Sequence, residues 1–128
     1  MRTNLLMSSS ALFMGILGFA ASFMTQEILT HLGAVPNASS TLLVQVMGAL
    51  YLGFAILNWM ARSVMIGGIY ARPVALGNFL HFAVVTTAAW KVIAAGAVTS
   101  RILLAACCLY TVFAVWFGFV LFTTPRKE

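Results

Sequence analysis

Charged residues in this chain stand between long apolar stretches rather than inside them. The 128 residues include only seven Lys or Arg and two Asp or Glu. Four ranges contain none of these residue types: 3–26, 28–61, 73–90 and 102–125. About twenty apolar residues in a helix suffice to cross the roughly 30 Å hydrocarbon core of a bilayer. The sequence therefore predicts an integral membrane protein with four spanning helices.

The composition leaves no room for a soluble domain. Apolar residues make up 62% of the chain and charged residues 7%, whereas soluble domains average about 45–50% and about 25%. Short connections between helices make neighbouring helices antiparallel. We therefore expect an all-α integral membrane fold, an antiparallel four-transmembrane-helix bundle. It forms one domain, residues 1–128, with spans at about 8–25, 41–61, 73–96 and 101–123.

Local signals mark the ends of these helices. The loop after the first helix is predicted to hold Glu27, His31 and the Gly- and Pro-containing stretch 33–37. Three residues offer N-cap chemistry for the second helix: Asn37, Ser39 and Ser40. Thr99 or Ser100 is expected to cap the fourth helix.

The basic residues predict an orientation in the membrane. On one side lie five of them: Arg2, Arg62, Arg72, Arg126 and Lys127. On the other side lie only Lys91 and Arg101. The excess of Lys and Arg marks the cytoplasmic side, so both termini and the 62–72 loop are expected there. Because the basic residues stand singly beside spans and form no accessible patch, nucleic-acid binding is not expected.

Polar residues inside the spans gather in the second and third predicted helices. Asn58 and Arg62 are one turn apart on a shared face, and Tyr51 lies two turns from Asn58 on the same stripe. Asn78 and His81 share a face of the third helix. Because these two helices are joined by a tight antiparallel turn, the two asparagines, Arg62 and His81 are all expected in the cytoplasmic half of the bundle, where they could converge.

Two interpretations of this polar cluster remain open. In the first it forms a ligand-binding pocket, in which Arg62 holds an anionic or carbonyl group and Asn58 and Asn78 donate hydrogen bonds. His81 would exchange a proton near neutral pH. In the second interpretation the side chains bond one another and lock the helices together. Polar groups facing lipid are costly, so both interpretations place them in the protein interior.

Other residues in the spans suggest further roles. Gln45, Thr86 and Thr87 would bond neighbouring helices or, with His81, line a pore. The helical stripe of Tyr110, Phe113 and Phe117, with Trp116 beside it, predicts aromatic packing, lipid contact or the wall of a flat ligand site. Small residues recur four apart in four pairs: Ala11/Gly15, Gly18/Ser22, Ala49/Gly53 and Ala114/Gly118. Such pairs let helices approach closely, within one bundle or between copies of it. Adjacent Cys107 and Cys108 point about 100° apart on a helix and are expected to stay unpaired.

Two stretches resemble a known protein family. They are the run from Gly48 to Ala55 with Asn58-Trp59, and Arg72-Pro73 followed by the run from Gly77 to Phe82. These stretches, about 40 residues in the second and third helices, are similar to small bacterial four-helix membrane proteins of the DoxX-like type. The resemblance implies a four-helix bundle in the bacterial inner membrane. It also implies a link to quinol-oxidising assemblies, which some members have.

The function expected from these observations is non-enzymatic. The chain would act as an accessory subunit or as a binder of a lipid-soluble small molecule, quinone-like or a bound lipid. The binding residues would be Asn58, Arg62, Asn78, His81 and Tyr51. No catalytic residue, metal or tightly held cofactor is expected. Membrane lipids, a membrane-protein complex or a homo-oligomer are the expected partners. The alternative is a small oligomeric transporter or channel.

Overall fold

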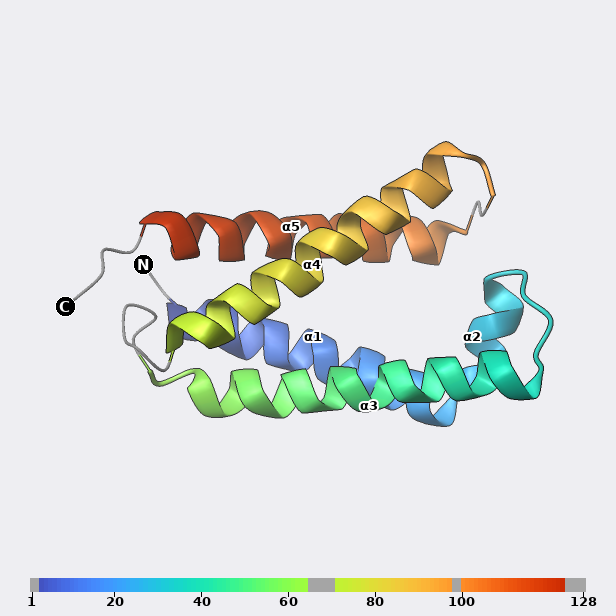
Figure 1. Ribbon diagram of the computed structural model, residues 1–128, viewed down its shortest axis with the longest axis horizontal. Helices are drawn as coiled ribbons and strands as arrows, with labels where there is room; N and C mark the ends of the chain where they lie inside the picture. The colour runs from blue at the N-terminus through green and yellow to red at the C-terminus, as the bar shows by residue number, and fades with distance from the viewer. Residues whose placement is uncertain (1–2, 65–70, 98–99, 124–128) are drawn as a thin grey trace. The chain divides into compact units, whose positions relative to one another are not determined.

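Four long helices and one short helix make up the described part of the chain. The structure is a computed structural model that describes residues 3–64, 71–97 and 100–123, and no strand occurs in these ranges. The helices are α1 (Thr3–Phe23), α2 (Thr25–His31), α3 (Ala38–Ala61), α4 (Ala71–Ala94) and α5 (Arg101–Thr123) (Figure 1). The four long helices are also apolar enough to span a membrane. The predicted fold class, an all-α membrane protein built on four spanning helices, is confirmed.

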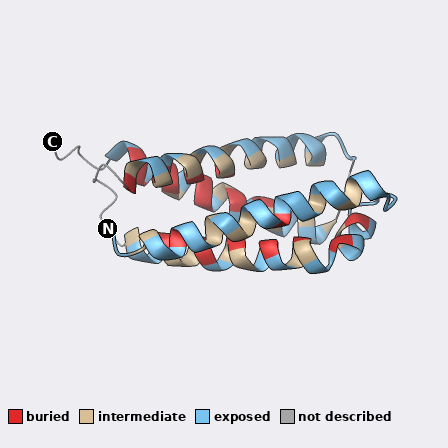
Figure 2. Cartoon of the chain, turned by 60° about the horizontal axis from the view of Figure 1, so that its bottom comes forward, coloured by how far each residue is buried: buried red, intermediate tan, exposed pale blue. Residues whose placement is uncertain are grey.

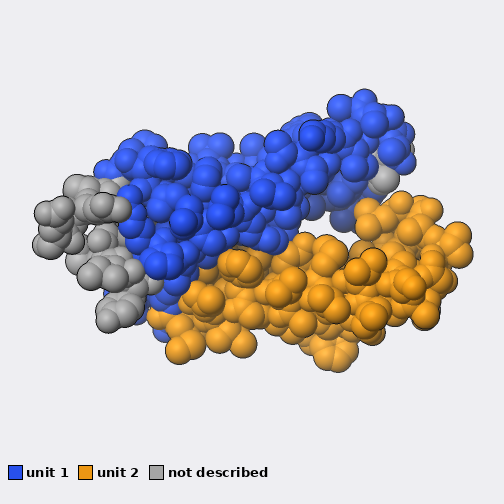
Figure 3. Space-filling model, viewed as in Figure 1, with its two compact units in different colours: residues 1–7, 61–128 blue, residues 8–60 orange. Residues whose placement is uncertain are grey.

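Contacts divide the chain into two units (Figure 3). The N-terminal unit comprises residues 8–60 and contains most of α1 together with α2 and nearly all of α3. The C-terminal unit comprises residues 1–7 and 61–128 and contains α4 and α5. Four residues with predicted roles near the membrane surface lie outside the described ranges: Arg2, Thr99, Arg126 and Lys127. The single domain over residues 1–128 stays a prediction.

In the N-terminal unit, α1 and α3 form an antiparallel pair that depends on small residues. Three pairs of close neighbours join the helices: Gly15 with Ala55, Gly18 with Leu52, and Ser22 with Gly48. A Cβ atom on Gly18 would lie only 2.8 Å from the backbone nitrogen of Leu52. The backbones therefore touch, as small residues in membrane helices allow. Most of α3 is otherwise exposed or half-buried, and its buried residues are Gly48 and Asn58 (Figure 2).

The first helix differs from the prediction at both ends. It begins at Thr3 rather than near Ser8 and ends at Phe23 rather than Thr25. At its end, Ser22 Oγ donates to the carbonyl of Gly18 at 2.8 Å, and Thr25 Oγ1 donates to the carbonyl of Ala21 at 2.7 Å. Such back-bonding by Ser and Thr bends helices. The chain accordingly leaves helical geometry at Met24, where φ is −117° and ψ is 37°.

The predicted loop after the first span was partly wrong, because Glu27 and His31 lie in α2. This helix ends at His31, and Gly33, two residues later, adopts a left-handed φ of 73°. The Ala34 N–H donates to the carbonyl of Leu29 at 2.9 Å, and the Gly33 N–H donates to that of Thr30 at 3.0 Å. These two bonds form a Schellman cap. Only the residues after this cap form the predicted loop.

The predicted N-cap of the next helix is confirmed at Asn37. Its Oδ1 accepts from the Ser40 N–H at 2.9 Å, and Ser40 Oγ accepts from the Asn37 N–H at 3.0 Å. This reciprocal pair is a capping box with Asn and Ser in its two positions. It satisfies backbone donors at the start of α3, which begins at Ala38 rather than Thr41.

In the C-terminal unit, α4 and α5 pack antiparallel through aromatic and small side chains. A Cβ atom on Gly118 would lie 2.9 Å from the ring of Phe79, so this glycine makes room for the ring. Trp90 Nε1, near the end of α4, donates to Thr111 Oγ1 in the middle of α5 at 3.1 Å. The predicted packing role of the Ala114/Gly118 pair is confirmed, because Ala114 is also buried.

The end of α4 was predicted two residues too late. The helix ends at Ala94 rather than Gly96, because Gly96 adopts a left-handed φ of 67°. The Ala97 N–H donates to the carbonyl of Val92 at 3.3 Å, and the Gly96 N–H donates to that of Ile93 at 3.0 Å. This second Schellman cap closes α4. At the start of α5, the Leu104 N–H donates to the Ser100 carbonyl at 3.1 Å, which places Ser100 at the predicted cap position.

Candidate functional site

The N-terminal unit holds a buried polar pair between α1 and α3. Asn58 Nδ2 donates to Ser10 Oγ at 3.1 Å, and both residues are fully buried. The register of the helix pair explains the contact, since Ser22 faces Gly48 and positions farther back along α1 face positions farther along α3. The bond gives both polar groups a partner, which the hydrocarbon chains of lipid could not provide. One of the predicted binding residues therefore has a structural partner.

The sequence interpretation missed Ser10 as a polar partner. A run of three serines, Ser8 to Ser10, lies at the predicted start of the first span. The depth of Ser10 along the span is the sequence signal that could have identified it as a partner of Asn58. In an antiparallel pair, the start of α1 lies level with the end of α3, where Asn58 is. Polar residues at matched depth on neighbouring helices are candidates to bond each other.

A double-mutant cycle on Ser10 and Asn58 tests this pair. Ser10→Ala and Asn58→Ala are each expected to lower the free energy of unfolding in detergent, with a coupling of about 0.5–1.5 kcal/mol between them. The same cycle between Asn58→Ala and Ser40→Ala is the control, because Ser40 contacts Asn37 at the surface. A coupling for Ser10 no larger than that of the control would contradict the contact.

The C-terminal unit holds a contact between a histidine of α4 and a tyrosine of α5. His81 is the eleventh residue of the 24-residue α4, so it lies about 15 Å along the helix, near the middle of the span. Its Nε2 is 3.4 Å from the hydroxyl of Tyr110 on α5. His81 is half-buried and Tyr110 is buried. An ionisable side chain at this depth is by default a candidate for function.

An aromatic cluster surrounds this pair. Its members are His81, Phe82, Tyr110, Phe113 and Phe117. The ring of Phe82 is fully buried and stacks on Phe113 and Phe117, with ring centroids 5.0 and 5.6 Å apart. Tyr110 lies 5.2 Å from Phe82. Of the three roles predicted for the stripe on α5, aromatic packing is thus confirmed. Ring packing within the cluster fixes the positions of His81 and Tyr110.

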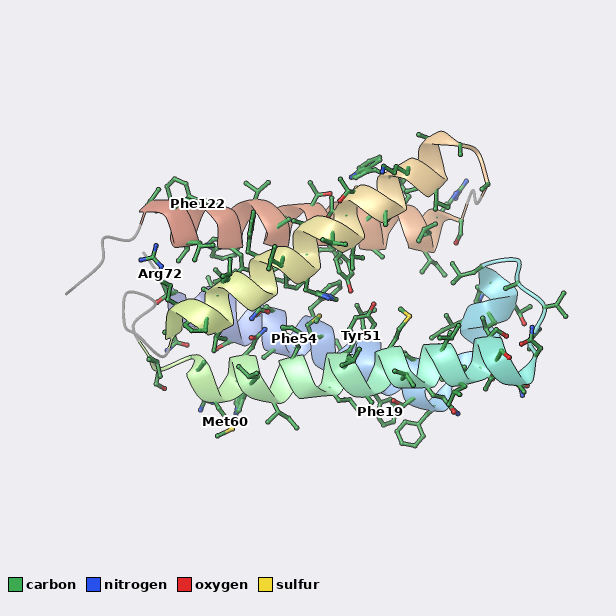
Figure 4. All side chains as sticks on the ribbon, in the orientation of Figure 1. Phe19, Tyr51, Phe54, Met60, Arg72 and Phe122 are labelled. Atoms are coloured by element: carbon green, nitrogen blue, oxygen red, sulfur yellow. The ribbon has the colours of Figure 1, made fainter. Side chains whose placement is uncertain are left out.

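The remaining predicted binding residues lie in both units. Asn78, fully buried on α4, donates through Nδ2 to the carbonyl of Val74 at 2.9 Å. Arg62 follows the end of α3 and is half-buried, as is Tyr51 on α3. Tyr51 and Phe54 project from the same side of α3 (Figure 4). Asn58 and Tyr51 belong to the N-terminal unit, while Arg62, Asn78 and His81 belong to the C-terminal unit. Convergence of Asn58, Arg62, Asn78 and His81 stays a prediction.

The three polar residues suggested as a pore lining differ in their surroundings. Thr87 is exposed, and its hydroxyl donates to the carbonyls of Ala83 and Val84 on its own helix. Thr86 Oγ1 is buried and has no hydrogen-bond partner in the described residues. Gln45 is exposed on α3. The two cysteines are free, with Cys107 buried and Cys108 exposed.

Two grooves in the described part have apolar walls. One, of about 630 Å³, lies along α1 from Ala11 to Met24 and is bordered on α3 by residues between Ala55 and Trp59. The other, of about 490 Å³, lies along α5 from Thr111 to Phe119 and includes Trp116. Neither groove offers the polar groups that would fix a polar ligand, and both suit a lipid chain. No group of three metal-ligating side chains occurs among the described residues.

These observations define a multi-pass α-helical membrane protein with buried polar groups in its spans. The chain matches no protein-family model, no curated protein and no solved structure.

Proposed function

We propose that this protein binds a lipid-soluble small molecule with a carbonyl group, quinone-like in chemistry, and acts as a non-enzymatic accessory subunit. The observation that carries the proposal is the contact between His81 and Tyr110 near the middle of the span. A neutral imidazole and a phenol each offer a donor and an acceptor. Together they can bind a carbonyl or hydroxyl oxygen of a ligand that enters from the lipid. A contact that only joined α4 to α5 would not need an ionisable group.

The surroundings of the pair support the same ligand class. The aromatic cluster is rigid and apolar, as the binding site of a flat hydrophobic ring would be. Asn78, one turn before His81 on α4, adds a buried amide. The predicted roles of Arg62, Asn58 and Tyr51 as further ligand contacts belong to this proposal. The resemblance to DoxX-like proteins, some linked to quinol oxidation, favours a quinone over a simple lipid.

The cellular setting is part of the proposal. The excess of basic residues on the side of Arg62 and Arg72 favours an orientation with both termini in the cytoplasm. The resemblance to DoxX-like proteins favours the bacterial inner membrane. In that orientation α4 starts on the cytoplasmic side, and His81 lies slightly on that side of the bilayer centre. A ligand that diffuses within the membrane could reach this depth without crossing water.

Binding of a short-chain benzoquinone to the protein in lipid nanodiscs tests the function. Quenching of the fluorescence of its three tryptophans reports the dissociation constant. His81→Ala is expected to raise that constant about tenfold, because one good hydrogen bond contributes about 1–1.5 kcal/mol. Tyr110→Phe is expected to weaken binding about threefold or more on the same grounds. Native mass spectrometry of the protein from mild detergent should show a retained small molecule.

The matched control is His31→Ala, which removes the other histidine of the chain from an exposed position on α2. It should leave binding unchanged. If His81→Ala lowers thermal stability but leaves quinone binding intact, the polar residues are a helix lock and the proposal fails. Ion or solute flux through proteoliposomes, abolished by the same variant, would instead favour the transporter alternative.

A further inference from the structure

Charge is distributed unequally between the two ends of the spanning helices. The end where α1 and α4 begin and α3 and α5 finish adjoins five basic side chains and one acidic side chain: Arg2, Arg62, Arg72, Arg126, Lys127 and Glu128. The other end adjoins two basic side chains and one acidic side chain: Lys91, Arg101 and Glu27. We call the first of these the basic end, and its basic residues in the described part of the chain are Arg62 and Arg72.

Arg62 and Arg72 lie at the depth of lipid headgroups. Arg62 directly follows α3, and Arg72 is the second residue of α4. Each of these helices has 24 residues and is about 36 Å long, so about 3 Å of helix projects beyond each face of a hydrocarbon core of roughly 30 Å. Arg72 lies at the same end of the C-terminal unit as Phe122, which is close to the end of α5 (Figure 4). Both guanidinium groups can therefore reach a phosphate group in the layer of headgroups just outside the core.

No carboxylate in the described part of the chain compensates these two charges. Glu27 is the only Asp or Glu among the described residues, and it lies in α2, after the far end of α1. The first residues of α1 belong to the same unit as Arg62 and Arg72, and Glu27 follows them about 30 Å farther along the helix axis. Both arginines are half-buried, whereas Lys91 and Arg101 are exposed. A partly desolvated charge is unfavourable unless an opposite charge accompanies it, so the basic end calls for an anionic partner from outside the chain.

We propose that Arg62 and Arg72 bind the phosphate groups of anionic phospholipids. Arginine suits this chemistry because its planar guanidinium donates two parallel hydrogen bonds to phosphate oxygens. A zwitterionic headgroup also carries an ammonium group, which the positive charge of the basic end repels. An anionic headgroup without an ammonium group, such as phosphatidylglycerol, is therefore preferred. Leu76, one turn into the span from Arg72, offers an apolar surface to the acyl chains of the same lipid, and a free phosphate ion could not use that surface.

Native mass spectrometry of the full-length protein tests the proposal with phosphatidylglycerol as the probe. The protein is reconstituted in vesicles of equal parts phosphatidylglycerol and phosphatidylcholine with the same acyl chains, and is then extracted in mild detergent. The wild-type protein is expected to retain more phosphatidylglycerol than phosphatidylcholine. One arginine near a membrane surface contributes about fivefold to the binding of anionic lipid, so Arg62→Gln and Arg72→Gln should each lower the ratio of the two retained lipids about fivefold. Arg72→Lys keeps the charge and should restore most of that ratio.

Arg101→Gln is the matched control, because it removes the same charge from the exposed first residue of α5 at the other end of the span. It should leave the lipid ratio unchanged. A large excess of inorganic phosphate distinguishes the lipid from free phosphate as the ligand, and it should not displace the retained lipid. Binding of benzoquinone should be unchanged in Arg72→Gln, because the lipid site does not depend on the site at His81. Equal retention of the two lipids by the wild-type protein, an equal loss with Arg101→Gln, or displacement by inorganic phosphate would overturn the proposal.

Discussion

Replacing Phe82 with alanine is expected to lower the free energy of unfolding by about 2–4 kcal/mol. The ring is fully buried and lies 5.0–5.6 Å from three other aromatic rings, those of Tyr110, Phe113 and Phe117. Its removal leaves a cavity between α4 and α5 that rigid neighbours cannot fill. Transfer from water contributes little, because lipid is as apolar as the protein interior. Lost dispersion contacts and aromatic stacking account for the effect.

The measurement is reversible unfolding in mixed detergent micelles with increasing sodium dodecyl sulfate, followed by far-UV circular dichroism. Phe119→Ala is the matched control, because Phe119 lies on α5 and is 54% exposed. Its side chain faces detergent in both states, so the change should stay below about 1 kcal/mol. Equal losses for the two variants would show that the aromatic cluster does not hold α4 and α5 together.

The fold class could be predicted from the sequence because it depends on the composition and on where the few charged residues stand along the chain. Charge-free runs long enough to cross a bilayer leave few alternatives to spanning helices. Helix ends were less predictable. The break at Met24 follows from hydroxyl groups that bond backward to the preceding turn, and nothing in the apolar pattern marks it. The left-handed caps at Gly33 and Gly96 agree with the general preference for glycine after helices.

The candidate site was predictable only as a set of residues on their own helices. His81 is conspicuous as an ionisable residue inside a span. Its contact with Tyr110, 29 positions away, depends on the register of α4 against α5. The pairing of Ser10 with Asn58 depends likewise on the register of α1 against α3. A single sequence shows which face of a helix is polar, but register is set by how side chains of two helices fit together.

The register of α1 against α3 also decides which small residue of α3 is in contact, and this residue is Gly48. The four-residue spacing of small residues drew attention to Ala49 and Gly53 on α3, yet the close approach to α1 occurs at Gly48. A Cβ there would lie 2.6 Å from Ser22 Oγ, 2.9 Å from Ser22 N and 3.1 Å from Ala21 Cβ. Ser22 Oγ is itself held by its bond to the Gly18 carbonyl. The backbone nitrogen cannot yield without moving the helix.

Gly48→Ala is therefore expected to lower the free energy of unfolding by about 1–3 kcal/mol, since overpacking forces α1 and α3 apart. Gly53→Ala is the matched control on the same helix. With no heavy atom within 4 Å, the added methyl should raise stability by up to about 1 kcal/mol through helix propensity alone. The two substitutions are chemically identical, so opposite signs can arise only from what surrounds each glycine. Detergent unfolding of both variants at high dilution measures the difference. If the two changes have the same sign and size, α1 and α3 do not meet at Gly48.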